Sequence, residues 1–273
     1  MHHVSNAFQK QRFFQVLHFG DQCPWRLWVV EQAKRAAAES GGIWEALDIS
    51  SRPELAARHG IFFPTVTVID NEIRIPSPTP ASRLLQIIDD QKPNAPFDEK
   101  PQADEGRAEK VIPLTADNIS DTCRLCIPPS ESGGCQAKQA WARSISPKIP
   151  DGFLGFAACQ GEEIVGAVEY LPSLLIPYPI PEKSPSIAFI TCIYSQEDKG
   201  DVLDYRSQAL AYLLGYLPTR GFCFVQVVAG LHTAYPNGPK QFFTDRGFEE
   251  INTLGTFILG ESEETLVLME KSV

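Results

Sequence analysis

The reactive groups that stand out in this chain of 273 residues are its seven cysteines. Cys23 lies in the tetrapeptide CPWR, at the start of a stretch with helical periodicity. A thiol at the start of a helix is expected to have a lowered pKa, because the helix dipole favours the thiolate. Arg26, three residues later, would favour the thiolate further, but it has no sulfur with which to resolve a mixed disulfide.

A second group of thiols lies in the stretch CRLCIPPSESGGC, which contains Cys123, Cys126 and Cys135. Cys123 and Cys126 are three residues apart and would share one face of a helix, and Cys135 follows a Gly-Gly pair that is expected to form a turn. Inert buried thiols, a redox or soft-acceptor role, and a three-thiolate metal site all agree with this pattern. Because no fourth ligand is near, we predict no metal. The candidate redox thiols are Cys23, Cys126 and Cys135, and whether the last two pair is left open.

Before residue 92 the pattern predicts a strand, a helix, a strand, a helix, two strands and a helix. The strands are expected at 13–20, 43–50, 62–70 and 71–75, and the helices at 26–40, 52–60 and 80–89. Asp70-Asn71 is expected to turn a hairpin between the last two strands. This order resembles the thioredoxin fold. In that resemblance, Cys23 stands where the family carries C-x-x-C, and Pro64 stands where it has a cis-proline that faces the cysteine.

Residues 92–110 combine three prolines with alternating charges and few apolar side chains. Such a segment cannot bury enough surface to order itself, so it is predicted to be a flexible linker. The chain is long enough for two cores. We therefore expect a thioredoxin-like domain over residues 1–91, the linker over 92–110 and a second domain over 111–273.

In the second domain, a helical region is predicted over residues 117–145, and a strand pair over 152–172 around a turn at Gly161. The proline-rich segment 172–185 is expected to be a surface loop. Residues 184–230 have the pattern of a strand, a loop, a helix and a strand, and a final hairpin is expected over 256–271.

This order resembles the acyl-CoA-binding half of the GNAT N-acetyltransferases. The residues that match the family's R/Q-x-x-G-x-G/A and FYxxxGF motifs are Arg206, Ala209, Ala211, Phe242, Phe243, Gly247 and Phe248. The resemblance implies a GNAT-like domain with a mixed, largely antiparallel sheet. Together with the thioredoxin-like part, it implies an α/β protein.

The resemblance also implies acetyl-CoA as co-substrate, with its diphosphate on backbone N–H groups at the start of the helix after Arg206. Ala209 replaces the family's first glycine, which narrows the space for a phosphate. Two strands are expected to separate, so that a backbone N–H of Ile193 or Tyr194 holds the thioester carbonyl. The candidate cofactor-binding residues are Cys192, Ile193, Tyr194, Arg206, Ser207, Gln208, Ala209, Leu210 and Ala211.

In that family the tyrosine of FYxxxGF often serves as general acid, and Phe243 takes its place here. Another donor is therefore needed, for which Tyr235 is the nearest candidate, followed by Tyr194 and His232. Tyrosines also serve as packing anchors, and His232 also suits a loop cap. Glu169, at the end of a predicted strand, is the candidate base.

The net charge of the chain is −10, and the acidic excess lies entirely after residue 92. Nucleic-acid binding requires clustered Lys and Arg, so no nucleic-acid partner is expected. No apolar run is long enough to span a bilayer, and the first residues lack the apolar core of a secretion signal, so we expect no membrane partner and a cytoplasmic location. The acidic excess suits a small cationic amine acceptor and equally suits solubility alone. A homo-oligomer is compatible with the sequence, which leaves the oligomeric state open.

The expected function is therefore that of an acetyl-CoA-dependent N-acetyltransferase, which transfers the acyl group directly to a small amine that could also bear a thiol. The alternative is a monothiol thioredoxin-like redox protein whose GNAT-like domain is a non-catalytic recognition module. Ala209 and Phe243 favour this alternative. An interaction protein with neither activity is a third reading, which Arg26 favours.

Overall fold

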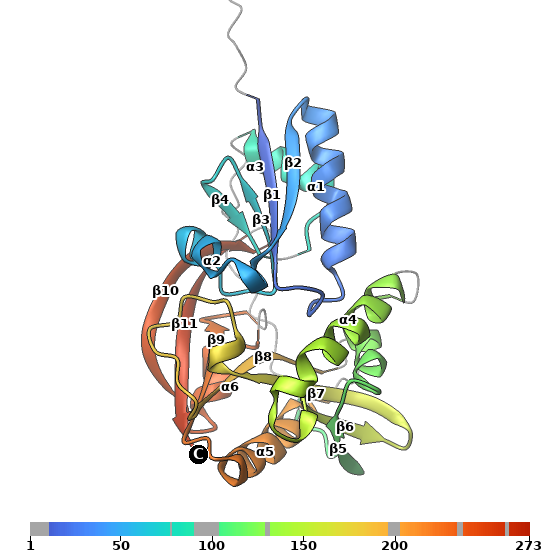
Figure 1. Cartoon of the computed structure of the whole chain (residues 1–273), viewed down its shortest axis with the longest axis vertical. Coiled ribbons are helices and arrows are strands. Elements are labelled where there is room, and N and C mark those ends of the chain that lie inside the picture. Colours follow the sequence, from blue (N-terminus) through green and yellow to red (C-terminus); the bar gives the residue numbers. More distant parts are fainter. Residues whose placement is uncertain are drawn as a thin grey trace, which may run out of the picture.

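The computed structural model describes residues 11–76, 78–89, 104–128, 132–195, 203–233, 237–259 and 262–273. These residues form two mixed sheets, one from the N-terminal third of the chain and one from the remainder, stacked along the long axis of the molecule (Figure 1). The protein is thus a mixed α/β structure. Among the described residues, no helix is long and apolar enough to cross a membrane.

The first sheet has the strand order β2-β1-β3-β4. Its elements follow the chain as β1 (Phe13–His18), α1 (Arg26–Ser40), β2 (Ile43–Asp48), α2 (Pro53–His59), β3 (Thr65–Ile69), β4 (Ile73–Ile75) and α3 (Ala81–Ile88). β1 pairs parallel with β2 and antiparallel with β3, and β3 pairs antiparallel with β4. The predicted succession of strands and helices is confirmed.

Local chemistry explains how two of these elements end. α1 stops at Gly41, whose φ of 65° lies in the left-handed region that glycine adopts without strain. The turn between β3 and β4 places Asp70 and Asn71 at φ values of 54° and 64°. This backbone conformation matches the twist of a two-residue hairpin, and short polar side chains tolerate it. The predicted hairpin is confirmed.

The second sheet has the order β10-β11-β9-β8-β7-β6-β5 within the described residues. Its strands are β5 (Lys110–Leu114), β6 (Gly155–Gln160), β7 (Glu163–Pro172), β8 (Ile187–Ser195), β9 (Phe224–Gly230), β10 (Glu249–Leu259) and β11 (Ser262–Ser272). Only β8 and β9 pair in parallel, and the other neighbouring strands are antiparallel. The expected mixed, largely antiparallel sheet is present, as are the turn at Gly161 and the final hairpin.

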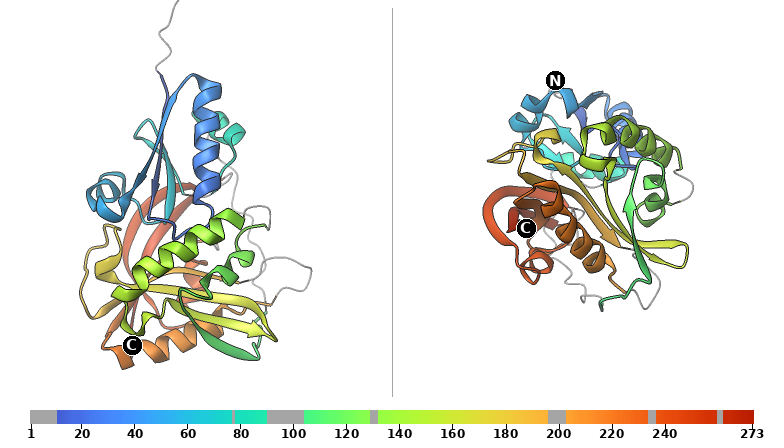
Figure 2. Two further views of the ribbon diagram at one scale, coloured as in Figure 1. Left: turned by 45° about the vertical axis from the view of Figure 1, so that its right-hand side comes forward. Right: turned by 60° about the horizontal axis from the view of Figure 1, so that its bottom comes forward.

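Helices cover both faces of the second sheet (Figure 2). The 3-10 helix η2 (Ile119–Leu125) and α4 (Ser132–Ile145) lie on the face toward the first sheet, whereas α5 (Arg206–Tyr216) lies on the opposite face. A short helix, α6 (Lys240–Thr244), precedes β10. The predicted helical region 117–145 is thus two separate elements. Pro128, which has no backbone N–H to continue a helix, follows the first of them.

The two sheets share one apolar core. The ring of Phe19, just after β1, packs edge-on against Trp141 of α4 at 5.8 Å and against Tyr178 at 5.9 Å. On the other side, Phe63 packs edge-on against Phe257 of β10 at 5.4 Å. A second, smaller apolar cluster lies between the first sheet and helices α1 and α3. Aromatic side chains therefore join the two halves of the chain.

The edge strands β4 and β10 also meet at this junction. The guanidinium of Arg74 on β4 lies 4.5 Å from the centre of the Phe257 ring, and its Nη2 donates to the carbonyl of Thr256 at 3.4 Å. A cation above an aromatic face is stabilising, so this contact reinforces the apolar packing.

The proline-rich segment 172–185 departs from its prediction as a surface loop. It has little regular structure, as expected, but Ile176, Tyr178 and Ile180 are buried. Tyr178 lies between Phe19 of the first half and Phe189 of β8. The segment is therefore part of the shared core, because its apolar side chains meet a partner surface that lies far away in the sequence.

Candidate functional site

Three side chains, two buried and one partly buried, form a polar centre on the side of the second sheet that faces the junction. Glu169 belongs to β7, Tyr194 to β8 and Lys138 to α4. Lys138 Nζ donates a hydrogen bond of 2.5 Å to Glu169 Oε1, and Tyr194 Oη donates to the same oxygen. The side chains of Lys138 and Glu169 are each 2% exposed. We refer to these three residues as the buried centre.

The environment of the buried centre determines its protonation. Burial opposes a charge on Lys138, but the attraction of Glu169 and other neighbours outweighs it, so the pKa of Lys138 is raised. Burial and the Glu169 carboxylate raise the pKa of Tyr194 well above its ordinary value. Near neutral pH, Lys138 is therefore an ammonium and Tyr194 a neutral hydroxyl. Both donate to a carboxylate that is shielded from water.

Thiols surround the buried centre. The charge of Lys138 acts on the thiols of Cys23, Cys123, Cys126 and Cys192. Cys23 comes from the turn before α1, and the side chain of Thr65, the residue after Pro64, lies near enough to lower its pKa in part. All seven cysteines are free thiols. The structure thus brings two predicted redox thiols, Cys23 and Cys126, next to the predicted Glu169 and Tyr194.

The prediction of a lowered pKa for Cys23 is wrong. Burial is the largest effect and raises the pKa, and the favourable contacts with Trp25 and Lys138 offset only part of it. Cys23 also precedes α1, which begins at Arg26, and Arg26 binds Asp21. The helix dipole and the arginine therefore do not overcome the loss of water around the thiol.

Burial acts in the same way on the neighbouring thiols. It raises the pKa of Cys126 to about 12 and raises that of Cys192 well above its ordinary value. Because the thiolate is the nucleophile, a raised pKa makes these thiols weaker nucleophiles.

A close backbone approach fixes Cys23 to this site. A Cβ atom on Gly134 of α4 would lie 2.0 Å from the carbonyl oxygen of Pro24, so only glycine fits there. Trp25 Nε1 donates to the carbonyl of Cys126 at 3.0 Å. The Gly-Gly pair predicted as a turn belongs instead to the first turn of α4, where it provides this space.

A second feature of the site is the divergence of β8 and β9. The two strands pair only from Ile187 with Phe224 to Ile190 with Val227. Beyond Ile190, β8 continues beside β7, and its register there skips Thr191. The predicted separation of two strands in this part of the sheet is therefore present. Glu169 is the register partner of Cys192, so the buried centre lies beside the opening.

Asn237 spans the opening between the diverging strands. Its Oδ1 accepts a hydrogen bond from the Ile193 N–H at 3.1 Å, and its Nδ2 donates to the Val228 carbonyl at 3.0 Å. The Ile193 N–H, one of the two predicted carbonyl donors, is thus engaged by this chain. The sequence reasoning missed Asn237, because a single amide in a loop produces no periodic signal.

At the start of α5, Arg206 is held by a buried carboxylate. Asp204 Oδ1 accepts from the Arg206 backbone N–H at 2.9 Å, and Asp204 Oδ2 pairs with the Arg206 guanidinium at 2.7 Å. A Cβ atom on Gly238 would lie 2.6 Å from Arg206 Nη1, so this glycine makes room for the guanidinium. The predicted residue Arg206 therefore points its charge toward Asp204.

Residues 104–108, from the predicted linker, lie against the same helix start. Glu105 accepts hydrogen bonds from Ser207 Oγ at 2.8 Å and from Arg246. The Ala108 N–H donates to Gln208 Oε1. Two carboxylates of this chain, Glu105 and Asp204, thus occupy the place where the resemblance puts a diphosphate.

The remaining predicted residues fall as follows. Ala209 and Leu210 are buried and Ala211 is exposed. Tyr235 lies outside the described residues. The backbone N–H of His232 donates to Glu264, and its Nδ1 lies 3.3 Å from the same carboxylate. In the described part of the chain, no group of three or more His, Cys, Asp or Glu side chains is arranged to hold a metal ion.

Lys138 was missed by the sequence reasoning, although it left a signal. It lies on the buried side of α4, in line with Gly134, Trp141, Ala142 and Ile145. A lysine at a position of helical apolar spacing requires a buried counter-ion or a route to water. A charged side chain at an apolar position of a helix is therefore a sequence signal for a candidate site residue.

Comparison with models of known protein families finds no match, and comparison with curated proteins finds none. Several solved structures show a likeness. An acetyltransferase of the GNAT family from Bacillus cereus ATCC 10987 aligns over 61% of this chain and 98% of its own, at 15% identity and a TM-score of 0.42. An N-acetyltransferase from Staphylococcus aureus Mu50 aligns over 61% of this chain and 99% of its own, at 12% identity and a TM-score of 0.44.

The ribosomal-protein-S18-alanine N-acetyltransferase from Escherichia coli aligns over 60% of this chain and 92% of its own, at 13% identity and a TM-score of 0.41. Because these TM-scores are below 0.5, the function has to be decided by the site itself.

Proposed function

We propose that this chain transfers an acyl group from an acyl-CoA thioester to a small amine. The observation that supports this most is the divergence of β8 and β9 after Ile190, directly beside the buried centre. Strands that separate within a sheet leave backbone groups free of a strand partner, and such fixed donors stabilise a developing oxyanion. Asn237 already binds the Ile193 N–H. The donor to the thioester carbonyl is therefore a backbone N–H around Thr191, which the register between β7 and β8 skips.

The start of α5 carries two cations that a diphosphate would need, each paired with a carboxylate of this chain. Arg206 and Arg246 supply two guanidinium groups beside the first helical turn, where backbone N–H groups also favour anions. Glu105 is 65% exposed, whereas Asp204 is 7% exposed. In this proposal a diphosphate replaces Glu105 on Arg246 and leaves Asp204 on Arg206. Acetyl-CoA bound in this way would supply the activated acyl group for the transfer.

The buried centre would handle the amine proton. Tyr194 shares its hydroxyl hydrogen with Glu169, so the pair can take a proton at Oη while passing another to the carboxylate. Lys138 compensates the charge of that carboxylate and holds it in position. Tyr235 stays the first candidate for the acid that protonates the leaving thiolate.

The first test is calorimetric binding of acetyl-CoA to the full chain. Two variants at one contact form a matched pair. Arg246→Gln removes a cation from the proposed diphosphate site and should weaken binding roughly tenfold, as expected for one charge-assisted contact. Glu105→Gln removes the competing carboxylate and should tighten it. If neither the unmodified chain nor the Glu105→Gln variant binds acetyl-CoA, the proposal is wrong.

The second test is turnover with a panel of small amines, followed by mass spectrometry of the acylated product. Tyr194→Phe, which keeps the Lys138–Glu169 ion pair, should lower kcat at least about tenfold, since general acid–base groups contribute typically 10²–10⁴-fold. If the chain binds acetyl-CoA but acylates no amine of the panel, its second domain is a recognition module and not an enzyme.

A thiol redox function is the second candidate, and the contact of Cys23 with Thr65, next to Pro64, favours it. In this candidate the N-terminal domain is thioredoxin-like. Its test is alkylation of the folded chain, with the exposed Cys223 as internal reference. Cys23 must react at a measurable rate relative to Cys223. Complete protection of Cys23 would remove this candidate.

A further inference from the structure

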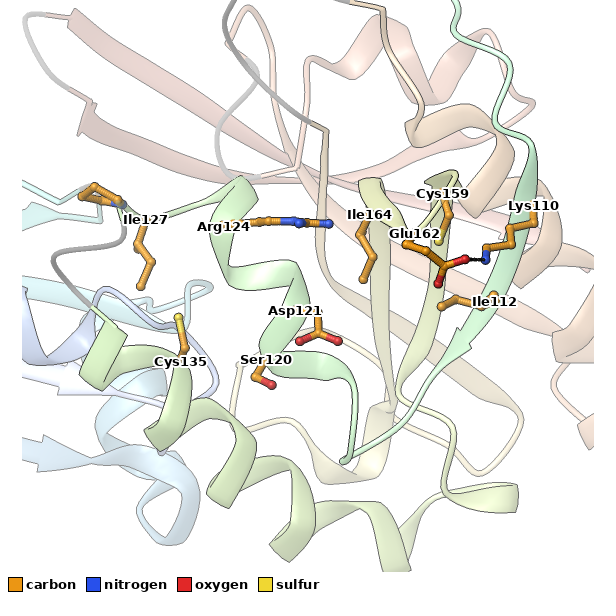
Figure 3. Close-up of a pocket in the computed structure, with 11 residues that line it drawn as sticks. Lys110, Ile112, Ser120, Asp121, Arg124, Ile127, Cys135, Cys159, Glu162 and Ile164 are labelled. Carbon is orange, nitrogen blue, oxygen red and sulfur yellow. Dashed lines mark hydrogen bonds and ion pairs between the residues drawn. The ribbon is translucent and has the colours of Figure 1, made fainter.

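A surface cavity of about 450 Å³ lies on the side of the second sheet that η2 covers. Figure 3 shows Cys135 of α4 at one end of this cavity, the ion pair of Lys110 and Glu162 at the other, and Arg124 of η2 between them. The candidate catalytic and cofactor-binding residues do not line it, whereas the predicted redox thiol Cys135 does. The cavity is therefore separate from the site of the proposed acyl transfer.

Two thiols meet at one end of this cavity. Cys135 lines the cavity, and its thiol interacts with the neighbouring thiol of Cys123 on η2, which contributes to the raised pKa of Cys123. Cys123 is 1% exposed, and Cys135 is partly exposed. One thiol of the pair can therefore be reached from solvent while the other lies behind it. The sequence reasoning considered Cys126 as the partner of Cys135, but the contact is made by Cys123.

The polar rim of the cavity carries both signs of charge. Lys110 pairs with Glu162 at 3.0 Å, Arg124 lies 3.7 Å from Glu163, and the carboxylate of Asp121 also lines the cavity. Ile112, Ile127 and Ile164 supply an apolar wall. A small molecule that bears ammonium and carboxylate groups around a less polar middle would match this arrangement.

We propose that the cavity is a dithiol site at which Cys135 and Cys123 reduce a small zwitterionic disulfide. The Cys135 thiol loses its proton to solvent, and its sulfur attacks one sulfur of the disulfide. The S–S bond of the substrate breaks, and one half leaves and takes up a proton as a thiol. The Cys123 sulfur then attacks the Cys135 sulfur, the Cys123 proton passes to the departing sulfur, and the second half leaves as a thiol. The chain loses two electrons and gains the Cys123–Cys135 disulfide, and the substrate gains the same two electrons.

The surroundings of the two thiols explain this order. Burial raises the pKa of Cys123, so this thiol is a poor first nucleophile. Once a mixed disulfide exists on Cys135, the contact between the two sulfurs makes the second attack intramolecular. Cys159 also lines the cavity, but it is 1% exposed and burial raises its pKa as well.

The test uses the reduced full chain with cystine as the disulfide. Cys223 is exposed, so a Cys223→Ser background removes a surface thiol that would react on its own. After acid quenching and alkylation, peptide mapping by mass spectrometry is expected to find Cys123 linked to Cys135. In a Cys123→Ser variant the reaction should stop with a cysteinyl group on Cys135. A Cys159→Ser variant is the matched control and should behave like the unmodified background.

Charge recognition gives an independent readout. Arg124→Gln should slow oxidation by cystine about fivefold, as for loss of one exposed charge contact, and should not slow oxidation by the uncharged hydroxyethyl disulfide. The proposal is overturned if cystine leaves both thiols reduced, if the cysteinyl group forms on Cys159 or Cys23, or if the mixed disulfide persists with Cys123 intact. Because the experiment contains no acyl-CoA, its failure would leave the proposed acyl transfer untouched.

Discussion

Lys138 shows at the scale of one residue how the site is held. A lysine that is 2% exposed survives in the interior because Glu169 lies 2.5 Å from its ammonium group. The cost of removing both charges from water is offset only while both partners remain in place. Any change to one of them leaves the other as an isolated buried charge.

Lys138→Met should therefore destabilise the chain strongly. The substitution keeps the length of the side chain but leaves Glu169 without its cation, which typically costs about 3–5 kcal/mol for a buried pair. Urea titration near neutral pH measures the free energy of unfolding. The double variant Lys138→Met/Glu169→Gln should recover much of the loss, because no unpaired charge then remains. A single variant as stable as the unmodified chain would show that water reaches Glu169.

His18 makes a second prediction at this scale, on pH dependence. Burial lowers the pKa of His18 below its ordinary value of 6.5, with a smaller lowering from Arg26. The unfolded chain therefore binds a proton more readily, and the contribution of His18 to stability is complete above that ordinary value and is lost as the pH falls through it. Between about pH 7 and pH 5, His18→Gln should therefore reduce the slope of the unfolding free energy against pH by up to about 1.4 kcal/mol per pH unit.

The comparison for that measurement is His59→Gln. Burial also lowers the pKa of His59, with smaller effects from Arg58 and Arg74, so this variant should flatten the same slope. If the His18→Gln variant follows the pH profile of the unmodified chain, His18 is hydrated in solution.

At the scale of elements, the periodic signals predicted most of the fold. Strands such as β1 and helices such as α1 follow from local spacing of apolar residues, which acts within the element itself. The burial of Tyr178 could not be predicted in this way, because its partner Phe19 lies in the other half of the chain. For the same reason the position of Glu169 in its strand did not reveal that Lys138 of α4 lies against it.

The contact between α4 and the turn before α1 gives a prediction at this scale, from two adjacent glycines. Gly134→Ala places a methyl group 2.0 Å from the Pro24 carbonyl oxygen, so the backbone must shift. We expect a loss of about 1–3 kcal/mol, as for overpacking in a core. Gly133→Ala is the matched control, since its Cβ would lie 3.7 Å from Leu27 Cδ1, an ordinary contact. It should be neutral or stabilise the helix by up to about 1 kcal/mol.

Thermal or urea unfolding of the two alanine variants measures the difference. Equal stability of the two would mean that α4 and the Pro24 turn do not touch in solution.

At the scale of the whole molecule, the shared core makes the two halves one cooperative unit. Phe19 and Phe63 of the first half pack into the core of the second, so neither half can unfold without exposing apolar surface of the other. The sequence predicted which segments form each sheet but not this packing, because an apolar residue does not reveal which surface covers it. The aromatic rings at the junction had no signal that set them apart from ordinary core residues.

We therefore expect a single unfolding transition in urea. Far-ultraviolet circular dichroism and tryptophan fluorescence should give coincident curves, since Trp141 lies at the junction. Phe19→Ala should shift both curves together, by a destabilisation of about 3–5 kcal/mol. Two separated transitions, or a shift of only one signal, would show that the halves unfold independently.

The contact of β4 with β10 has a consequence for dissecting this protein. Each is the last strand of its sheet, and a last strand presents unpaired backbone groups that can recruit other chains. The contact between Arg74 and Phe257 holds these two edge strands together. Expressing either half alone would expose an edge strand and the aromatic rings beside it. We therefore expect each separated half to aggregate under conditions in which the full-length protein does not.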